Sequence, residues 1–257
     1  MITLLNKFDD NYIMKEKDIL SIISSYIKEN NLEAYLKDVS FIDNTNHLGY
    51  YNVKTNELVL NDERIIKFGY RLFDKLNNKF HLNEDNYSYY LNFYYLYIIF
   101  HELTHINQKA KFEKSNNDDL FNYLYELCMK LHQNDVMFYS KNHDLFPMEI
   151  EANNKGLLRA YNLMTYTKLP LKECRVIKLQ YIHSLIKNYE RINNYRIITP
   201  IEKLLDASDA TEIRRINELL DNSRLSKIER MNLGVGITPR EYDSIIREKA
   251  KCLIKIK

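Results

Sequence analysis

The segment from Asn86 to Phe112 contains neither proline nor glycine, and apolar or aromatic residues dominate it. A stretch without helix breakers is typical of one long helix, and its apolar content predicts that this helix is mostly buried. The whole chain has only five glycines and four prolines in 257 residues. So few breakers favour helices over a fold of many short strands, because tight turns between strands usually need such residues.

The pattern of strands occurs in one part of the chain. Residues 39–43 have the composition of a short strand, and residues 49–61 predict two strands joined by a turn at residues 54–56. Helices are expected on either side, over residues 12–37 and 62–80. We therefore predict a predominantly helical α+β fold, in which a small β-hairpin or sheet packs on the long helix.

Further helices are predicted downstream of the long one. The first covers residues 117–140, and the second begins at Pro147 and ends near Tyr166. Proline suits the first turn of a helix, where its missing N–H is not needed. Residues 171–257 are expected to be helical in several segments, the last of which begins at Thr238 as the N-cap.

Composition and charge set limits on the class of protein. Hydrophobic residues make up 45% of the chain, enough for a packed core, and the net charge is +2. Residues 1–168 carry 19 basic and 23 acidic residues, whereas residues 169–257 carry 18 and 12. Because the acidic residues are interleaved with the basic ones, we interpret both regions as solvated helix faces, and nucleic acid is not the expected partner.

Cysteine spacing and targeting signals point to a soluble protein in a reducing compartment. The three cysteines, Cys128, Cys174 and Cys252, are far apart and form no CxxC pair, so neither a disulfide framework nor a thiolate metal site is expected. The N-terminus lacks the apolar core of a signal peptide, and the apolar run from Tyr94 to Phe100 is too short to cross a bilayer. We expect no membrane association and a cytoplasmic location.

The long helix carries the sequence His-Glu-Leu-Thr-His at residues 101–105. On a helix, His101 and His105 lie one turn apart on the same face, so both imidazoles can bind one zinc ion. Glu102 lies beside that position, where it can act as the general base toward a water molecule. With 7 His and 19 Glu in the chain, a random order produces this motif with a probability of roughly 0.014.

A catalytic zinc ion needs a third ligand from the protein. A third histidine at the spacing HExxHxxGxxH is excluded, because positions 108 and 111 are Gln and Lys. The best candidate is Glu149, which lies on the helix that begins at Pro147. Its rivals are Glu151, which does not share a helix face with Asn153, and His143, which is expected in an exposed loop.

Asn153 follows Glu149 by one helical turn, so both side chains point the same way. The side-chain oxygen of Asn153 is therefore predicted to accept a hydrogen bond from Nδ1 of a ligating histidine, which fixes the tautomer of that histidine. Ala152, between them, is small where two helices must approach closely.

These motifs together resemble the gluzincin class of zinc metallopeptidases. The sequence 101–105 followed by Glu-Ile-Glu-Ala-Asn at 149–153 is most similar to the ImmA/IrrE-like peptidases of bacteria and mobile elements, and the strand pair at 49–61 looks like the hairpin that precedes their active-site helix. The resemblance covers residues 35–165. It implies a bound Zn²⁺, a peptide or protein substrate along an edge strand, and Glu102 as the base.

The resemblance leads to a division of the chain and a mode of substrate binding. Residues 1–168 are expected to form the catalytic domain, and residues 169–257 a helical region of unstated role. A peptide is expected to add as a strand beside residues 57–61. In gluzincins a later His or Tyr stabilises the oxyanion, and the candidates are His183, Tyr161 and Tyr166, for each of which a packing role is the competing interpretation.

Two alternative functions remain open at this level. The first is a zinc-binding but catalytically inactive regulator that acts by binding a protein partner. The second is a regulator whose basic C-terminal helices bind nucleic acid, although residues 169–257 show no clear helix-turn-helix pattern.

Overall fold

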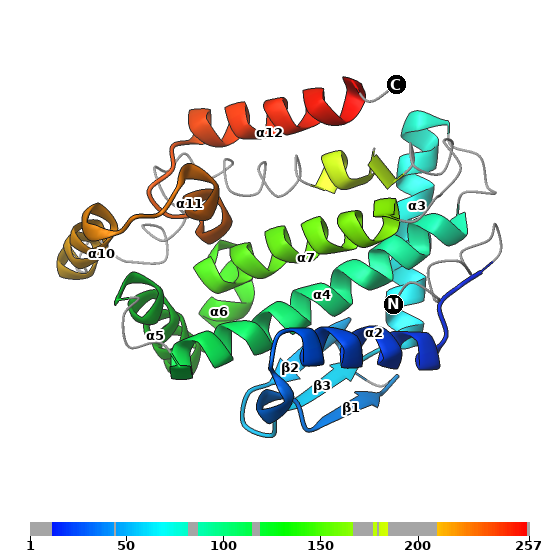
Figure 1. Ribbon diagram of the computed structural model, residues 1–257, viewed down its shortest axis with the longest axis horizontal. Helices are drawn as coiled ribbons and strands as arrows, with labels where there is room; N and C mark the ends of the chain where they lie inside the picture. The colour runs from blue at the N-terminus through cyan, green and yellow to red at the C-terminus, as the bar shows by residue number, and fades with distance from the viewer. Residues whose placement is uncertain are drawn as a thin grey trace. The chain divides into compact units, whose positions relative to one another are not determined.

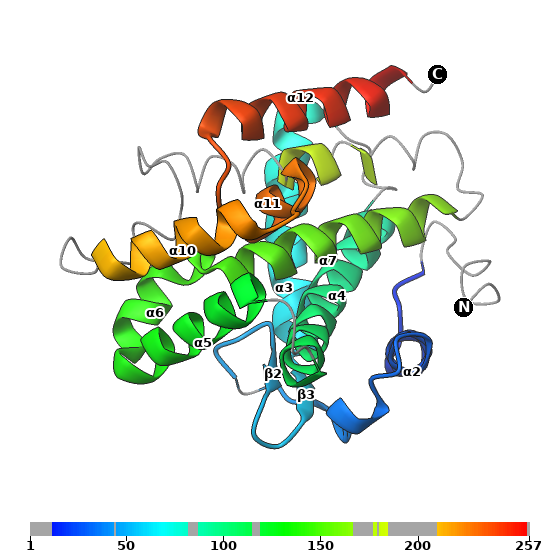
Figure 2. The ribbon, with the colours of Figure 1, turned by 60° about the vertical axis from the view of Figure 1, so that its left-hand side comes forward.

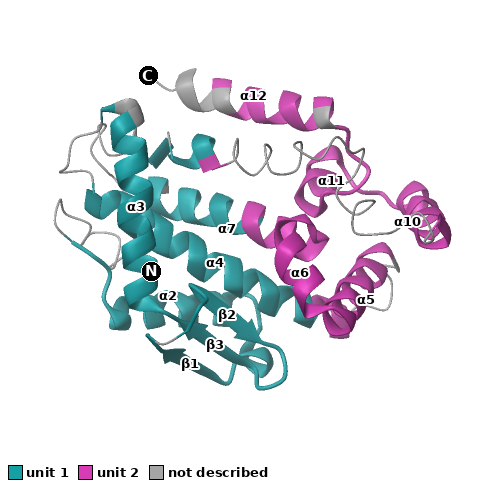
Figure 3. Cartoon of the chain, turned by 180° about the vertical axis from the view of Figure 1, so that it is seen from behind, with its two compact units in different colours: residues 1–110, 155–183 teal, residues 111–154, 184–257 magenta. Residues whose placement is uncertain are grey.

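The computed structural model describes residues 12–43, 45–81, 87–114, 119–166, 177–178, 180–184 and 210–255 (Figure 1). The predicted fold class is confirmed: the structure is predominantly helical with one small sheet. It divides into two compact units, residues 1–110 with 155–183 and residues 111–154 with 184–257 (Figure 3). The predicted boundary between residues 168 and 169 lies outside the described residues.

The first unit contains a three-stranded sheet. Strand β3 (Glu57–Leu60) is central, pairing in parallel with β1 (Asp38–Phe41) and antiparallel with β2 (Gly49–Asn52). The predicted β2–β3 hairpin is confirmed. Its turn ends at Asn56, which has a φ of 58°, a conformation that asparagine tolerates better than most residues.

The central position of β3 corrects one expectation. A peptide cannot add as a strand beside residues 57–61, because β3 is already hydrogen-bonded to a strand on each side. The strands at the edges of the sheet are β1 and β2. That prediction rests on the order of the motifs along the chain, which does not determine the order of strands in a sheet.

Helix α4 (Tyr87–Lys114) confirms the predicted long helix. Its buried side chains lie on every side of the helix, from Ser88 to Ala110, as expected for a helix that is apolar all round. Asn92, one of its few buried polar residues, accepts a hydrogen bond from the backbone N–H of Met14 (2.9 Å) and donates one to the carbonyl of Tyr12 (2.6 Å). These bonds hold the segment that leads into α2 (Glu16–Glu29).

The helix predicted over residues 12–37 is shorter than expected. Helix α2 ends at Glu29, and a short 3₁₀ helix, η1 (Glu33–Tyr35), follows. The break lies at Asn31, which has a φ of 54° and therefore cannot continue an α-helix. Helix α3 (Asp62–Phe80) agrees with the prediction and is capped by Asn61, whose side chain accepts a hydrogen bond from the N–H of Arg64.

The β-hairpin is attached to α4 at two points. At one end, a Cβ atom added to Gly49 would lie 3.4 Å from Cγ2 of Ile98. At the other end, the Lys109 ammonium group donates hydrogen bonds to the carbonyl of Val53 (2.8 Å) and to Oδ1 of Asn56 (2.6 Å). Edge strand β2 therefore runs beside the stretch of α4 that carries the two motif histidines (Figure 2).

Helix α7 (Pro147–Tyr166) begins at Pro147 as predicted and approaches α4 closely at Gly156. A Cβ atom at position 156 would lie 2.9 Å from the backbone N of His101 and 3.2 Å from the carbonyl O of Tyr97. Both neighbours are backbone atoms, which cannot rotate away as a side chain can. Glycine is therefore the residue that allows the two helix backbones to approach at this point.

The second unit contains helices that precede α7 in the chain and helices that follow it. These are α5 (Asp119–Asn134), α6 (Val136–Asn142), η3 (His143–Leu145), α10 (Ala210–Asn222), α11 (Lys227–Leu233) and α12 (Pro239–Lys255). The single helix predicted over residues 117–140 is instead two helices, because the Asp135 side chain accepts a hydrogen bond from the N–H of Phe138 and starts a new helix. The predicted N-cap of α12 is confirmed, since Thr238 Oγ1 accepts from the N–H of Glu241.

Among the residues that the structure describes, no helix is both long enough and apolar enough to cross a membrane.

The contact at Gly156 leads to a prediction of stability. Gly156→Ala should lower the free energy of unfolding by about 1–3 kcal/mol, because the added methyl group forces two helix backbones apart. A change from glycine to alanine within a helix normally stabilises a protein. The sign of the change in the free energy of unfolding therefore tests the contact. Asn162→Ala, at an exposed position of the same helix, is the control and should not destabilise. Chemical denaturation followed by circular dichroism measures both variants, and a stabilised Gly156→Ala variant would contradict the contact.

Candidate metal centre

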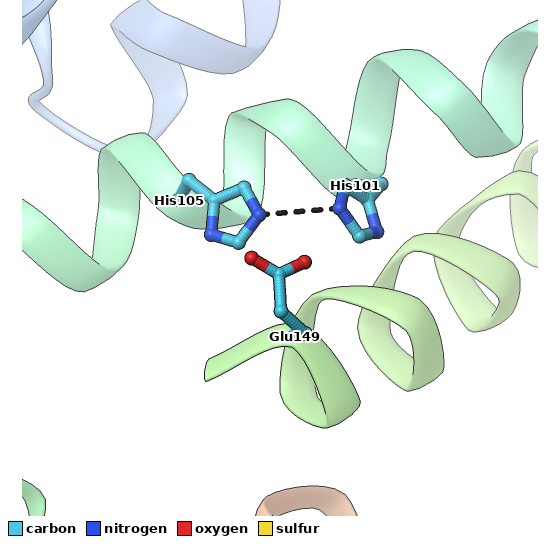
Figure 4. Close-up of side chains that lie close together, drawn as sticks. All are labelled: His101, His105 and Glu149. Carbon is cyan, nitrogen blue, oxygen red and sulfur yellow. Dashed lines mark hydrogen bonds between the residues drawn. The ribbon is translucent and has the colours of Figure 1, made fainter. Parts of the chain in front are cut away.

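The two motif histidines point to one position beside α4. Nε2 of His101 and Nε2 of His105 are 3.1 Å apart, and the ring centroids are 4.8 Å apart with planes inclined at 82° (Figure 4). This arrangement follows from the helix, because residues four positions apart lie on the same face. Two nitrogen ligands of one ion at 2.0–2.1 Å are about 3.3 Å apart in tetrahedral geometry, so the pair is spaced as ligands are.

The orientation of His105 is set from within α4. Its Nδ1 lies 2.8 Å from Oε1 of Gln108, whose side chain is only 3% exposed. With Oε1 of Gln108 as the acceptor, His105 donates from Nδ1, and this is the tautomer in which Nε2 is the nitrogen that can bind a metal. Sequence reasoning examined position 108 only as a place in a third-histidine motif, although its spacing of three from His105 was a visible signal.

Glu149 completes the group from helix α7. One ligand atom each from His101, His105 and Glu149 lie within 4.8 Å of one another, and Glu149 is 4% exposed (Figure 4). The three residues predicted as ligands thus come together and could hold a metal ion. The rival Glu151 is also buried but is not in this group, because two positions along a helix turn its side chain to a different face.

Two side chains of its own unit lie against the Glu149 carboxylate. The Tyr139 hydroxyl donates a hydrogen bond to Oε1 (2.7 Å), and Nε2 of His143 lies 3.3 Å from Oε2. The Tyr139 ring stacks on His132, with centroids 4.1 Å apart, and also contacts Phe146. Sequence reasoning expected His143 to be exposed and did not consider Tyr139. The His143 side chain is 44% exposed but still reaches Glu149 from η3.

The chemistry of the group suits a metal ion. Two neutral imidazoles and one carboxylate are the ligand set of many such sites. Cys128 is close enough to Glu149 to interact electrostatically, but burial raises the pKa of its thiol to about 12. In the absence of a metal ion this thiol is therefore protonated at neutral pH.

Glu102 lies next to the histidine pair. Its side chain is buried, and Oε1 is 4.0 Å from Nε2 of His101. The carboxylate is therefore on the side of α4 where the two Nε2 atoms meet, which is the placement that a base at this centre requires. Its predicted role remains a prediction.

The remaining predicted residues lie at different distances from the group. Asn153 is half-buried on α7. It was predicted to accept a hydrogen bond from Nδ1 of a ligating histidine. Because Nδ1 of His105 already contacts Gln108, His101 is the histidine to which this prediction still applies. Tyr161 is 12 positions beyond Glu149, about 18 Å along the helix axis, and its ring stacks on Tyr181 with centroids 4.6 Å apart.

Tyr161 is not a member of the metal-binding group. His183 follows Tyr181 by two positions and belongs to the first unit, as Tyr161 does. For Tyr161, the packing interpretation agrees with the ring contact. The side chain of Tyr166 lies outside the described residues.

The chain was compared with protein-family models, with curated proteins and with solved structures, and none of them matches it.

The contact between Gln108 and His105 predicts a measurable effect on metal affinity. Gln108→Met keeps the volume of the side chain but removes the oxygen that fixes the tautomer, so affinity for Zn²⁺ should fall by about 10–100-fold. Competition with a chromophoric chelator measures this value. Asn107→Ala, at the neighbouring position on another face of α4, is the control and should bind as the wild type does. Equal affinity of Gln108→Met and wild type would show that Gln108 does not orient the ligand.

Proposed function

We propose that this protein is a zinc-dependent metallopeptidase of the gluzincin type that hydrolyses a peptide bond in a protein substrate. The observation that carries the proposal is the meeting of His101, His105 and Glu149, with the Glu102 carboxylate beside His101. A helix that is otherwise apolar has little reason to bury these groups together, since each costs free energy unless it has a partner. The order of ligands and base along the chain is also that of the HExxH peptidases.

In this proposal the two histidines and Glu149 hold Zn²⁺, which when bound polarises the scissile carbonyl group and increases the acidity of the attacking water. Glu102 accepts a proton from that water as its oxygen bonds to the carbonyl carbon. The bond from carbon to nitrogen then breaks, and Glu102 delivers the proton to the leaving amine. Gln108 keeps His105 in the required tautomer throughout.

The substrate is proposed to lie along β2. Among the strands that the structure describes, β3 is paired on both sides, and β1 and β2 lie at the edges of the sheet. Of these, β2 is the strand attached to α4 on both sides of the motif, at Ile98 and at Lys109. A peptide that adds to this edge by main-chain hydrogen bonds passes next to Glu102.

Metal content tests the ligand set. Purified wild-type protein should contain about one zinc ion per chain, as catalytic sites of this type do, and His101→Ala and Glu149→Ala should each lose it. Mass spectrometry of the intact protein under native conditions measures the stoichiometry. A variant that keeps full zinc content without Glu149 would remove this residue from the ligand set.

Glu102→Gln separates metal binding from catalysis. The variant should keep its zinc, because the amide is nearly isosteric and Glu102 is not a ligand, but hydrolysis should fall by a factor of about 10²–10⁴ with the loss of the base. Cleavage of a peptide library followed by mass spectrometry measures the activity. Glu151→Gln, a buried position outside the metal-binding group, is the matched control and should stay active. Retained cleavage in Glu102→Gln would contradict the mechanism, and a zinc-loaded wild type without any activity would favour the non-catalytic zinc-binding regulator.

A further inference from the structure

A hydrogen-bond network holds the turn of the β-hairpin against α4. The Lys109 ammonium group donates to the carbonyl of Val53 (2.8 Å) and to Oδ1 of Asn56 (2.6 Å). The same Oδ1 atom lies 3.0 Å from the Tyr51 hydroxyl, which is also 2.7 Å from the carbonyl oxygen of Tyr35. The N–H and the carbonyl group of Asn56 are both hydrogen-bonded to other backbone groups. Lys109 therefore binds a part of the hairpin that is itself held by several hydrogen bonds.

Lys109 reaches the hairpin from the side of α4 that carries the two motif histidines. His101, His105 and Lys109 follow one another at intervals of four, so they lie along one side of the helix. All three are half-buried, whereas most residues of α4 are buried. The group that anchors the hairpin is thus one helical turn beyond the second histidine.

Strand β2 and the motif lie at the same level along α4. Gly49, at the start of β2, is next to Ile98. Val53, just after the end of β2, accepts the hydrogen bond from Lys109. From the rise per residue, these two contacts are about 16 Å apart along the helix axis and about 13 Å apart along the strand. Both motif histidines lie between Ile98 and Lys109 in the chain, so Tyr51, midway between the contacts, is level with them.

The register of the sheet shows which main-chain groups of β2 face its edge. The N–H of Asn61 donates to the carbonyl of Leu48 (2.9 Å), so these two residues, next to Gly49 in the register, form a hydrogen-bonded pair. In an antiparallel ladder such pairs alternate with pairs whose main-chain groups point the other way. Gly49 and Tyr51 therefore turn their N–H and C=O groups away from β3, toward the edge at which a peptide strand adds.

We propose that Lys109 is a positioning residue that holds the edge of β2 level with the histidine pair, so that the protein hydrolyses extended segments of a chain rather than short peptides. This inference rests on the proposed peptidase function. Val53 is the next residue in the alternation, and its carbonyl already accepts from Lys109. The anchor thereby marks one end of the edge.

The length of the edge sets a lower limit on the length of the substrate. The paired positions on an added strand are two residues apart, so pairing with both Gly49 and Tyr51 takes at least three residues in an extended conformation. A dipeptide reaches one of these positions at most. A longer segment that pairs with both has its centre beside the histidines.

Two inhibitors of different length test this role. A dipeptide phosphoramidate reaches the metal centre alone, whereas a hexapeptide phosphoramidate with the same metal-binding group can also pair with β2. Isothermal titration calorimetry on the full-length protein at saturating Zn²⁺ measures both affinities. Wild type should bind the hexapeptide about 10-fold more tightly, the typical gain from two main-chain hydrogen bonds. A hexapeptide with N-methylated amides cannot donate these bonds and should lose the gain.

Variants of Lys109 connect this gain to the anchor. Lys109→Met keeps the aliphatic stem but removes both hydrogen bonds to the hairpin. The gain of the hexapeptide over the dipeptide should then disappear, because binding has to order the edge, whereas the affinities for the dipeptide and for Zn²⁺ should stay unchanged. Lys109→Arg keeps a charged donor and should recover most of the gain, which also shows that the loss is not a folding defect. Lys111→Met removes an exposed lysine of the same helix and is the matched control.

Hydrogen exchange followed by mass spectrometry measures the anchor without an inhibitor. In Lys109→Met, the amides of residues 49–56 should exchange about 10-fold faster than in wild type, because the turn opens more often. Those of residues 101–105 should exchange at the wild-type rate.

The outcomes distinguish the inference from the function on which it rests. A hexapeptide gain that persists in Lys109→Met, or an equal loss of both inhibitors, would overturn the positioning role and leave the peptidase proposal intact. An N-methylated hexapeptide that binds as tightly as its parent would do the same, since the substrate would then not use the edge of β2. If zinc-loaded wild type binds neither inhibitor, the proposed function fails and the positioning role fails with it, even where the exchange rates confirm the anchor.

Discussion

The close approach of α7 to the backbone of α4 at Gly156 is the contact on which the candidate metal centre depends. The two motif histidines lie on one helix and need no tertiary contact to face the same way, but the third ligand comes from another helix. Gly156 meets the backbone of His101 itself, and Glu149 lies two turns earlier on the same continuous helix. A side chain at position 156 would push away the helix that carries the third ligand.

The centre also depends on how α4 accommodates polar groups in an apolar environment. Burying imidazole, carboxylate and amide groups costs free energy unless each is paired. Part of this cost is offset within the helix, where Gln108 contacts His105 and the Thr104 hydroxyl donates to the carbonyl of Phe100. At Glu149, the Tyr139 hydroxyl donates a hydrogen bond to one oxygen of the carboxylate. A buried cluster of polar groups with such specific partners is more typical of a functional site than of a structural helix.

The order of strands in the sheet is a feature that the local sequence pattern does not predict. The hairpin over residues 49–61 was visible in the sequence, because its alternation and its turn are local properties. The pairing of β1 with β3 is a long-range property, because the two strands are separated along the chain. With this pairing β3 is central, and β2 rather than β3 lies at an edge of the sheet. Lys109 of α4 donates a hydrogen bond to the carbonyl of Val53, the residue that follows β2, and this bond holds the edge strand beside the motif.

The sequence by itself determined the helical class, the hairpin, the long buried helix and the pair of histidines, since each follows from periodicity or spacing within one element. It also pointed to Glu149, because the motif lacked a third ligand and Glu149 shares a helix face with Asn153. Tertiary structure alone decided the rest. The packing of helices decides the backbone contact at Gly156 and the contacts of Tyr139 and His143 with Glu149. Packing brings together residues that no local sequence pattern relates to one another.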